Sequence, residues 1–112
     1  MFFRRNEINP YNVTCKLVFR NLDKTLTLTV KAHAGTLVLG IKKAYERIAA
    51  LKDESPEEEK AAAARMYAVT IFGEVQGAKL CEFYGDPLTV IQACSACLDE
   101  LRPKIIKAQK RK

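Results

Sequence analysis

Two cysteines with two residues between them, Cys94 and Cys97, form the sharpest chemical motif in the sequence. Such a pair can bind zinc or cycle between dithiol and disulfide when a helix N-terminus or a cation turns a thiol into a thiolate. A structural zinc site needs four ligands in spaced pairs, and the sequence has no second pair with this spacing. Cys94 also falls about two turns inside an expected helix, whereas a redox pair begins one. We therefore expect both cysteines to pack as small residues on a helix face, without metal or cofactor.

The single histidine and a run of acids are the other groups that could transfer protons. His33 ends a threonine-rich stretch, where we expect it to be exposed or to cap a helix. Asp53, Glu54 and the three glutamates at 57–59 fit the first turn of a helix, where the helix dipole favours negative charge. Motifs for phosphate loops, serine hydrolases and zinc proteases are missing from the sequence. The sequence therefore predicts no catalytic residue and no enzymatic activity.

The net charge of +6 over 112 residues is concentrated at one end. Six of the 19 basic residues lie in 102–112, which leaves 13 basic residues to balance the 13 acidic ones in the rest of the chain. We therefore expect one domain over residues 1–101 and a basic C-terminal extension over 102–112. Such an extension can contact phosphate, an anionic membrane or an acidic protein, and the charge does not distinguish them.

Membrane and secretion signals are missing as well. No apolar run approaches the roughly 18 to 20 residues that a membrane span requires, and residues 1–7 lack the apolar stretch of a signal peptide. The expected location is the cytoplasm.

The elements that carry these residues follow from hydrophobic periodicity. Residues 13–32 alternate between apolar and polar side chains, interrupted at 21–24 by turn-forming residues, which predicts an antiparallel hairpin with one apolar face. The rest of the chain has helical spacing, in segments after Gly35, after Ser55, from about Glu74 to Tyr84, and after Pro87. The expected fold class is α+β, with an N-terminal antiparallel β-hairpin packed on a bundle of about four helices. The free edge of the hairpin could accept a strand of another chain, or the hairpin could simply cover the helices.

Several residues mark the expected helix ends. Ser55, Pro56 and Glu58 fit a capping box at the start of the second helix. Gly73 suits the end of that helix, and Asp86 suits the N-cap of the last one. Proline cannot donate a helical hydrogen bond, so the proline at 103 is expected to interrupt or kink the last helix.

Three stretches of the C-terminal half form a recognisable pattern: IFGEVQ at 71–76, LCEFYGDP at 80–87, and PKIIKAQKR at 103–111. This pattern resembles small tail assembly chaperones of long-tailed bacteriophages and prophages, and its FYGDP part is the most specific. The sequence departs from the family pattern at Val75, where an acid is expected, and at 94–97, where an aromatic residue is expected. The resemblance covers roughly the C-terminal third of the chain.

This resemblance implies a non-enzymatic protein that coats the long helical tape measure protein and keeps it soluble until the tail tube assembles. It also implies self-association into rings or spirals in the cytoplasm of a bacterial host, with the tail tube protein as a further partner. The alternative is a small nucleic-acid-associated protein that binds through its basic end, although no aromatic residues alternate with the basic ones there. The candidate partner-binding residues are Phe83, Tyr84, Lys104, Lys107, Lys110, Arg111 and Lys112.

Overall fold

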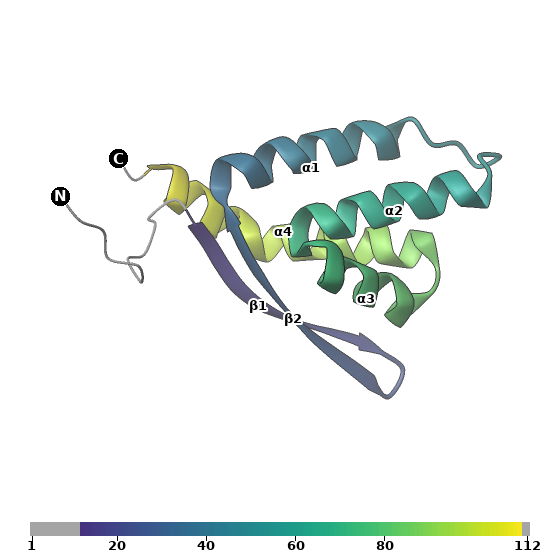
Figure 1. The fold of residues 1–112 in the computed structure, drawn as a ribbon, viewed down its shortest axis with the longest axis horizontal. Coiled ribbons are helices and arrows are strands. Elements are labelled where there is room, and N and C mark those ends of the chain that lie inside the picture. Colours follow the sequence, from purple (N-terminus) through teal and green to yellow (C-terminus); the bar gives the residue numbers. More distant parts are fainter. Residues whose placement is uncertain (1–11, 111–112) are drawn as a thin grey trace.

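A β-hairpin followed by four helices makes up the fold in the computed structural model, which describes residues 12–110 (Figure 1). The strands are β1 (Asn12–Asn21) and β2 (Lys24–His33). The helices are α1 (Ala34–Ala49), α2 (Glu57–Phe72), α3 (Glu74–Tyr84) and α4 (Pro87–Lys110). The predicted α+β class, with an antiparallel hairpin preceding the helices, is confirmed.

The hairpin packs one face on the helices, as its alternating sequence predicts. The two strands pair in register from Asn12 opposite His33 to Asn21 opposite Lys24. Alternate residues such as Leu17, Phe19 and Val30 are buried, whereas the threonines between the apolar residues of β2 are exposed. Since an isolated two-stranded hairpin is marginal in water, this contact with the helices stabilises the sheet.

A two-residue turn joins the strands, and its first residue, Leu22, has a left-handed backbone with φ of 58°. A leucine in this region costs roughly 1–2 kcal/mol, and Leu22 is 97% exposed, so packing does not offset the cost. Leu22→Gly is therefore expected to raise the free energy of unfolding by up to about 1 kcal/mol, measured by urea denaturation. Asp23→Gly, beside it in the turn, is the control and should not stabilise. A lower stability of Leu22→Gly would contradict the left-handed turn.

The helix starts agree with the sequence at α1 and α4 but not at α2. His33 caps α1, because its Nδ1 accepts a hydrogen bond from the backbone N–H of Gly35 at 3.2 Å. The Asp86 carboxylate caps α4 by accepting the backbone N–H of Thr89 at 3.1 Å. The capping box expected at Ser55 is wrong: α2 begins at Glu57, and the Ser55 hydroxyl accepts the Lys52 N–H at 2.8 Å instead. Ser55 thus stabilises the loop before α2 and does not cap the first turn of the helix.

Helix α4 continues through Pro103 to Lys110, so the expected interruption at this proline is wrong. Pro103 is exposed, which leaves water free to solvate the carbonyl that loses its helical hydrogen bond. Ile105 and Ala108 lie beyond it on the same face as Leu101, and all three are buried in the core. The domain boundary expected after Leu101 therefore falls inside α4. Arg111 and Lys112 lie outside the described residues.

Candidate functional site

The paired cysteines are part of the core. Cys94 and Cys97 lie inside α4, are 0% and 5% exposed, and are both free thiols. Burial raises the pKa of Cys97 to about 12 and also raises the pKa of Cys94. A thiol that stays protonated is a poor nucleophile and a poor metal ligand, so the arrangement suits packing. Within residues 12–110, no group of three or more histidine, cysteine or acidic side chains is placed to hold a metal ion.

The reactivity of these thiols gives a direct test. Raising the Cys97 pKa from an ordinary value of 9.0 to about 12 lowers its thiolate population at pH 8 about a thousandfold. In a thiol-reagent time course on the folded protein, Cys94 and Cys97 should react at least about a hundredfold more slowly than the partly exposed Cys15. The double variant Cys94→Ala/Cys97→Ala should lose the slow phase. Four thiols reacting at one fast rate would contradict the packing.

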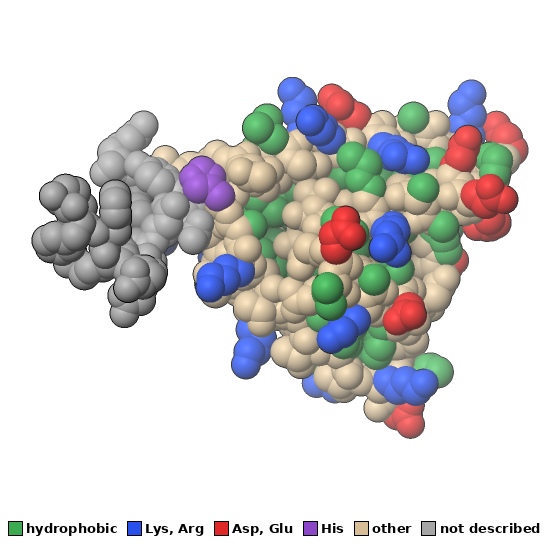
Figure 2. Space-filling model, viewed as in Figure 1, with side chains coloured by type: hydrophobic (Ala, Val, Ile, Leu, Met, Phe, Trp, Pro, Cys, Tyr) green, Lys and Arg blue, Asp and Glu red, His purple; other side chains and the backbone are tan. Residues whose placement is uncertain are grey.

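The histidine and the acids that were considered for acid–base chemistry contribute to helix ends. The His33 side chain caps α1, as described above. Glu57, Glu58 and Glu59 occupy the first turn of α2 and are exposed. Acidic side chains gather at the end of the molecule where α2 begins (Figure 2). The negative charge of Glu57, Glu58 and Glu59 stabilises the N-terminus of α2.

Phe83 and Tyr84, two of the predicted partner-binding residues, hold the hairpin on the helices. The Tyr84 hydroxyl donates to the carbonyl of Arg20 at 3.0 Å, and its ring meets that of Phe19 edge-on at 6.5 Å. The Phe83 carbonyl accepts a hydrogen bond from the side-chain amide of Asn21 at 2.9 Å. Both residues are half-buried and pack against the core, so they have a structural role.

Among the predicted basic residues that the structure describes, Lys104 and Lys107 lie near the C-terminal end of α4. Lys104 and Lys107 are exposed on its last turns, whereas the side chain of Lys110 is not among the described parts. Lys104 comes 17 positions after Pro87, which separates it from the end of α3 by ~25 Å along the helix. The structure therefore does not bring Lys104 or Lys107 together with Phe83 and Tyr84 into one site.

A groove between α1 and α4 is lined almost entirely by apolar side chains. Its volume is about 210 Å³. It is lined by Val38, Ile41, Tyr45, Leu98, Arg102, Ile105 and Ile106. Exposed apolar side chains on the groove include Tyr45 and Ile106, each 45% exposed, and Leu39 beside it on α1 is 63% exposed. Two parallel stripes of apolar residues with a gap between them are the geometry that accepts the apolar face of a third helix.

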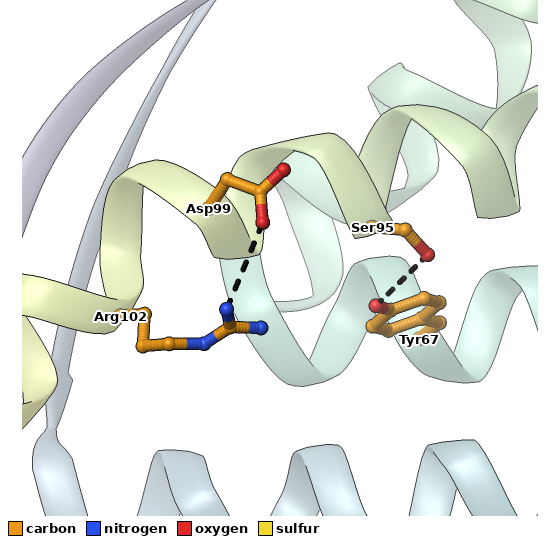
Figure 3. A network of polar contacts seen from close by, with 4 residues as sticks. All are labelled: Tyr67, Ser95, Asp99 and Arg102. Carbon is orange, nitrogen blue, oxygen red and sulfur yellow. Dashed lines mark hydrogen bonds and ion pairs between the residues drawn. The ribbon is translucent and has the colours of Figure 1, made fainter.

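The walls of this groove are positioned by contacts underneath it. Tyr45 meets the ring of the buried Tyr67 edge-on at 5.7 Å, and the Tyr67 and Ser95 hydroxyls lie 3.3 Å apart (Figure 3). Burial raises the Tyr67 pKa, so this hydroxyl stays protonated at neutral pH. Arg102, on the opposite wall, has its guanidinium 3.9 Å from the Asp99 carboxylate in an exposed pair, which holds it only weakly.

The sequence interpretation missed this groove, although one signal for it is present. Ile105 and Ile106 are adjacent, so a helix that buries Ile105 in the core must turn Ile106 elsewhere. Val38 and Leu39 follow the buried Leu37 in the same way on α1. Apolar residues beyond the core-facing stripe, on two helices, were the available indication of a second apolar face.

Comparison with known proteins gives no relative of this chain. No family, no curated protein and no solved structure matches it. Among the helices of residues 12–110, none has both the length and the apolar composition that crossing a bilayer requires.

Proposed function

We propose that the protein is a non-enzymatic tail assembly chaperone that binds the helical tape measure protein of a long-tailed phage. The observation that carries this proposal is the groove between α1 and α4, which is apolar, open and helix-lined. A long helical protein exposes apolar stripes before the tail tube surrounds it, and a groove of this kind covers such a stripe. The resemblance at FYGDP, residues 83–87, supports the same class.

The charges around the groove specify the partner further. Arg102 lines it, Lys104 and Lys107 are exposed on the same end of α4, and Lys42 and Lys43 are exposed on α1. The preferred helix therefore carries an apolar stripe flanked by acidic residues. Self-association along the tape measure protein, a later contact with the tail tube protein, and a location in the host cytoplasm complete the proposal.

Co-expression with a tape measure protein from the same phage genome tests the proposal. The wild-type chain is expected to form a complex and to increase the soluble fraction of that partner. Ile106→Glu places a charge on the groove without disturbing the core and should weaken the complex at least about tenfold. Leu88→Glu is the matched control, since Leu88 is 54% exposed on the same helix but outside the groove.

Two results would contradict this function. One is the absence of a complex with the wild-type chain, and the other is an equal loss with Ile106→Glu and Leu88→Glu. If the wild-type chain instead retains DNA or RNA with an affinity that falls steeply with salt, the alternative of nucleic-acid binding through the basic end is favoured.

A further inference from the structure

The two edges of the hairpin differ in how they are covered. Within residues 12–110 the sheet consists of β1 and β2, so each strand has one outer edge there. On β2, the side-chain amide of Gln76 from α3 occupies this edge at Thr29. The Thr29 N–H donates to Gln76 Oε1 at 3.0 Å, and the Thr29 carbonyl accepts from Gln76 Nε2 at 2.8 Å. Gln76 therefore makes the two hydrogen bonds that a third strand would make at this position.

These bonds also define which backbone groups face outward on β1. Thr29 lies opposite Lys16, and since Thr29 directs both of its groups away from β1, Lys16 directs its own groups away from β2. The alternation along a strand gives Val18 and Arg20 the same orientation. The bond from the Tyr84 hydroxyl to the Arg20 carbonyl agrees with it.

The middle of this β1 edge is open. Among the hydrogen bonds of residues 12–110, none satisfies the outward N–H of Lys16 or either outward group of Val18. The Lys16 carbonyl has only the thiol of Cys15 at 3.8 Å. Unpaired N–H and C=O groups in a row are a template for an added strand.

A groove runs alongside this open edge, between β1 and α4. Its volume is about 530 Å³, and residues 16–20 of β1 line it consecutively. The opposite side is formed by small side chains of α4, namely Ala93, Ala96 and Cys97, together with Glu100. Tyr84, whose hydroxyl is bonded to the Arg20 carbonyl, also lines the groove, so the free space lies beside Lys16 and Val18. An added strand lies about 4.8 Å from its neighbour, and these small residues leave room for its inward side chains. The edge and the space beside it therefore fit an extended segment.

Charge decides which segment fits. Lys16 and Arg20 are exposed on both sides of Val18, which is 54% exposed. Two copies joined through β1 and centred on Val18 would set Lys16 opposite Arg20 of the second copy, and like charges in this position are destabilising. The same two cations favour acids on an added strand. Glu100 lines the α4 side of the groove, so acids are unfavourable among the side chains that face α4.

We propose that the β1 edge binds an extended acidic segment of another protein as a third strand. The segment carries two acids four positions apart, opposite Lys16 and Arg20, with a β-branched residue between them opposite Val18. Recognition is through the backbone groups of Lys16 and Val18 together with these charges. This surface is separate from the groove between α1 and α4, so the inference does not rest on the proposed function.

A blocked nine-residue peptide of alternating threonine and valine, with glutamates at two positions four apart, is the probe. Its addition to the full chain should slow amide hydrogen exchange of Lys16 and Val18 at least about tenfold, whereas Thr27 on the β2 edge should not change. A peptide with lysines in place of the glutamates should bind at least about tenfold more weakly. An N-methylated peptide with the same side chains should also lose binding, because it cannot donate to the edge.

Two protein variants separate strand addition from simple charge attraction. Val18→Pro removes an outward N–H while keeping the hairpin bonds, and should weaken peptide binding at least about tenfold. Thr27→Pro makes the same change opposite Val18 on the β2 edge and should bind like the wild type. The proposal is overturned by no binding at millimolar peptide, by binding of the N-methylated peptide, or by binding without protection of Lys16 and Val18. Dimerisation of the free chain through β1 would overturn it as well.

Discussion

Removal of residues 102–112 is expected to lower the free energy of unfolding by about 3–5 kcal/mol, measured by urea denaturation. The deleted segment contains Ile105 and Ala108, which are 8% and 5% exposed and belong to the core cluster. Their loss also exposes Leu101, which is fully buried. Since small domains have a total stability of roughly 5–15 kcal/mol, a loss of this size would bring a domain at the low end of that range close to unfolding at moderate temperature.

Point variants separate the contribution of the apolar residues of this segment to stability from that of its basic residues. Ile105→Ala is expected to lower the stability by about 2–4 kcal/mol, because it removes buried apolar contacts and enlarges the groove between α4 and α1. The double variant Lys104→Ala/Lys107→Ala is the control, and it should stay within about 0.5 kcal/mol of the wild type because both side chains are exposed. If the truncated chain were as stable as the wild type, the packing of the last turns of α4 would be refuted.

This result also determines how binding through the basic residues must be tested. A truncation that unfolds the protein removes every surface at once, so its loss of binding says nothing about charge. Lys104→Ala/Lys107→Ala keeps the core residues of α4 and changes only exposed cations. A test of nucleic-acid or acidic-protein binding therefore has to use such charge variants in the full chain.

Much of the fold is predictable because local signals agree with one another. The period-two pattern of residues 13–32 defines the hairpin, its register and its buried face. Gly73, with φ of 87°, ends α2 where the sequence predicts, and Gly85, with φ of 78°, directly follows the predicted end of α3 at Tyr84. At Pro103 two local signals compete, since proline disfavours a helix interior while Leu101, Ile105 and Ala108 keep helical apolar spacing. Burying that apolar stripe stabilises the helix by more than the proline destabilises it. This balance can be judged only from the tertiary packing.

The candidate site is less predictable, because it depends on which faces remain uncovered. Phe83 and Tyr84 belong to the most specific part of the resemblance, yet their contacts bind the hairpin to α3. The coverage of the β2 edge by Gln76 depends on a contact 47 residues apart in sequence, which no local pattern shows. The open edge of β1 could be named as a possibility from the sequence, but only that contact shows that the two edges differ.

Gly77→Ala is expected to lower the free energy of unfolding by about 1–3 kcal/mol, even though alanine is the better helix former. Helix propensity alone predicts a stabilisation of about 1 kcal/mol at this position of α3. In the structure, however, a Cβ on Gly77 would lie 2.9 Å from the backbone N and Cα of Val69 on α2. Backbone atoms cannot rotate away as a side chain can, so α3 would have to shift. Helix propensity and packing thus predict changes in stability of opposite sign, so the measurement distinguishes between them.

Gly35→Ala is the matched control, because Gly35 is also helical and a Cβ there meets the His33 ring at an ordinary 3.4 Å. It should leave the stability unchanged or raise it by up to about 1 kcal/mol. A stabilised Gly77→Ala would mean that α2 and α3 are not in backbone contact. Gln76 precedes Gly77 and its amide is bonded to Thr29, so a shift of α3 should also speed the exchange of the Thr29 amide proton. Faster exchange at Thr29 in Gly77→Ala would thus connect the close packing of α3 on α2 to the coverage of the β2 edge.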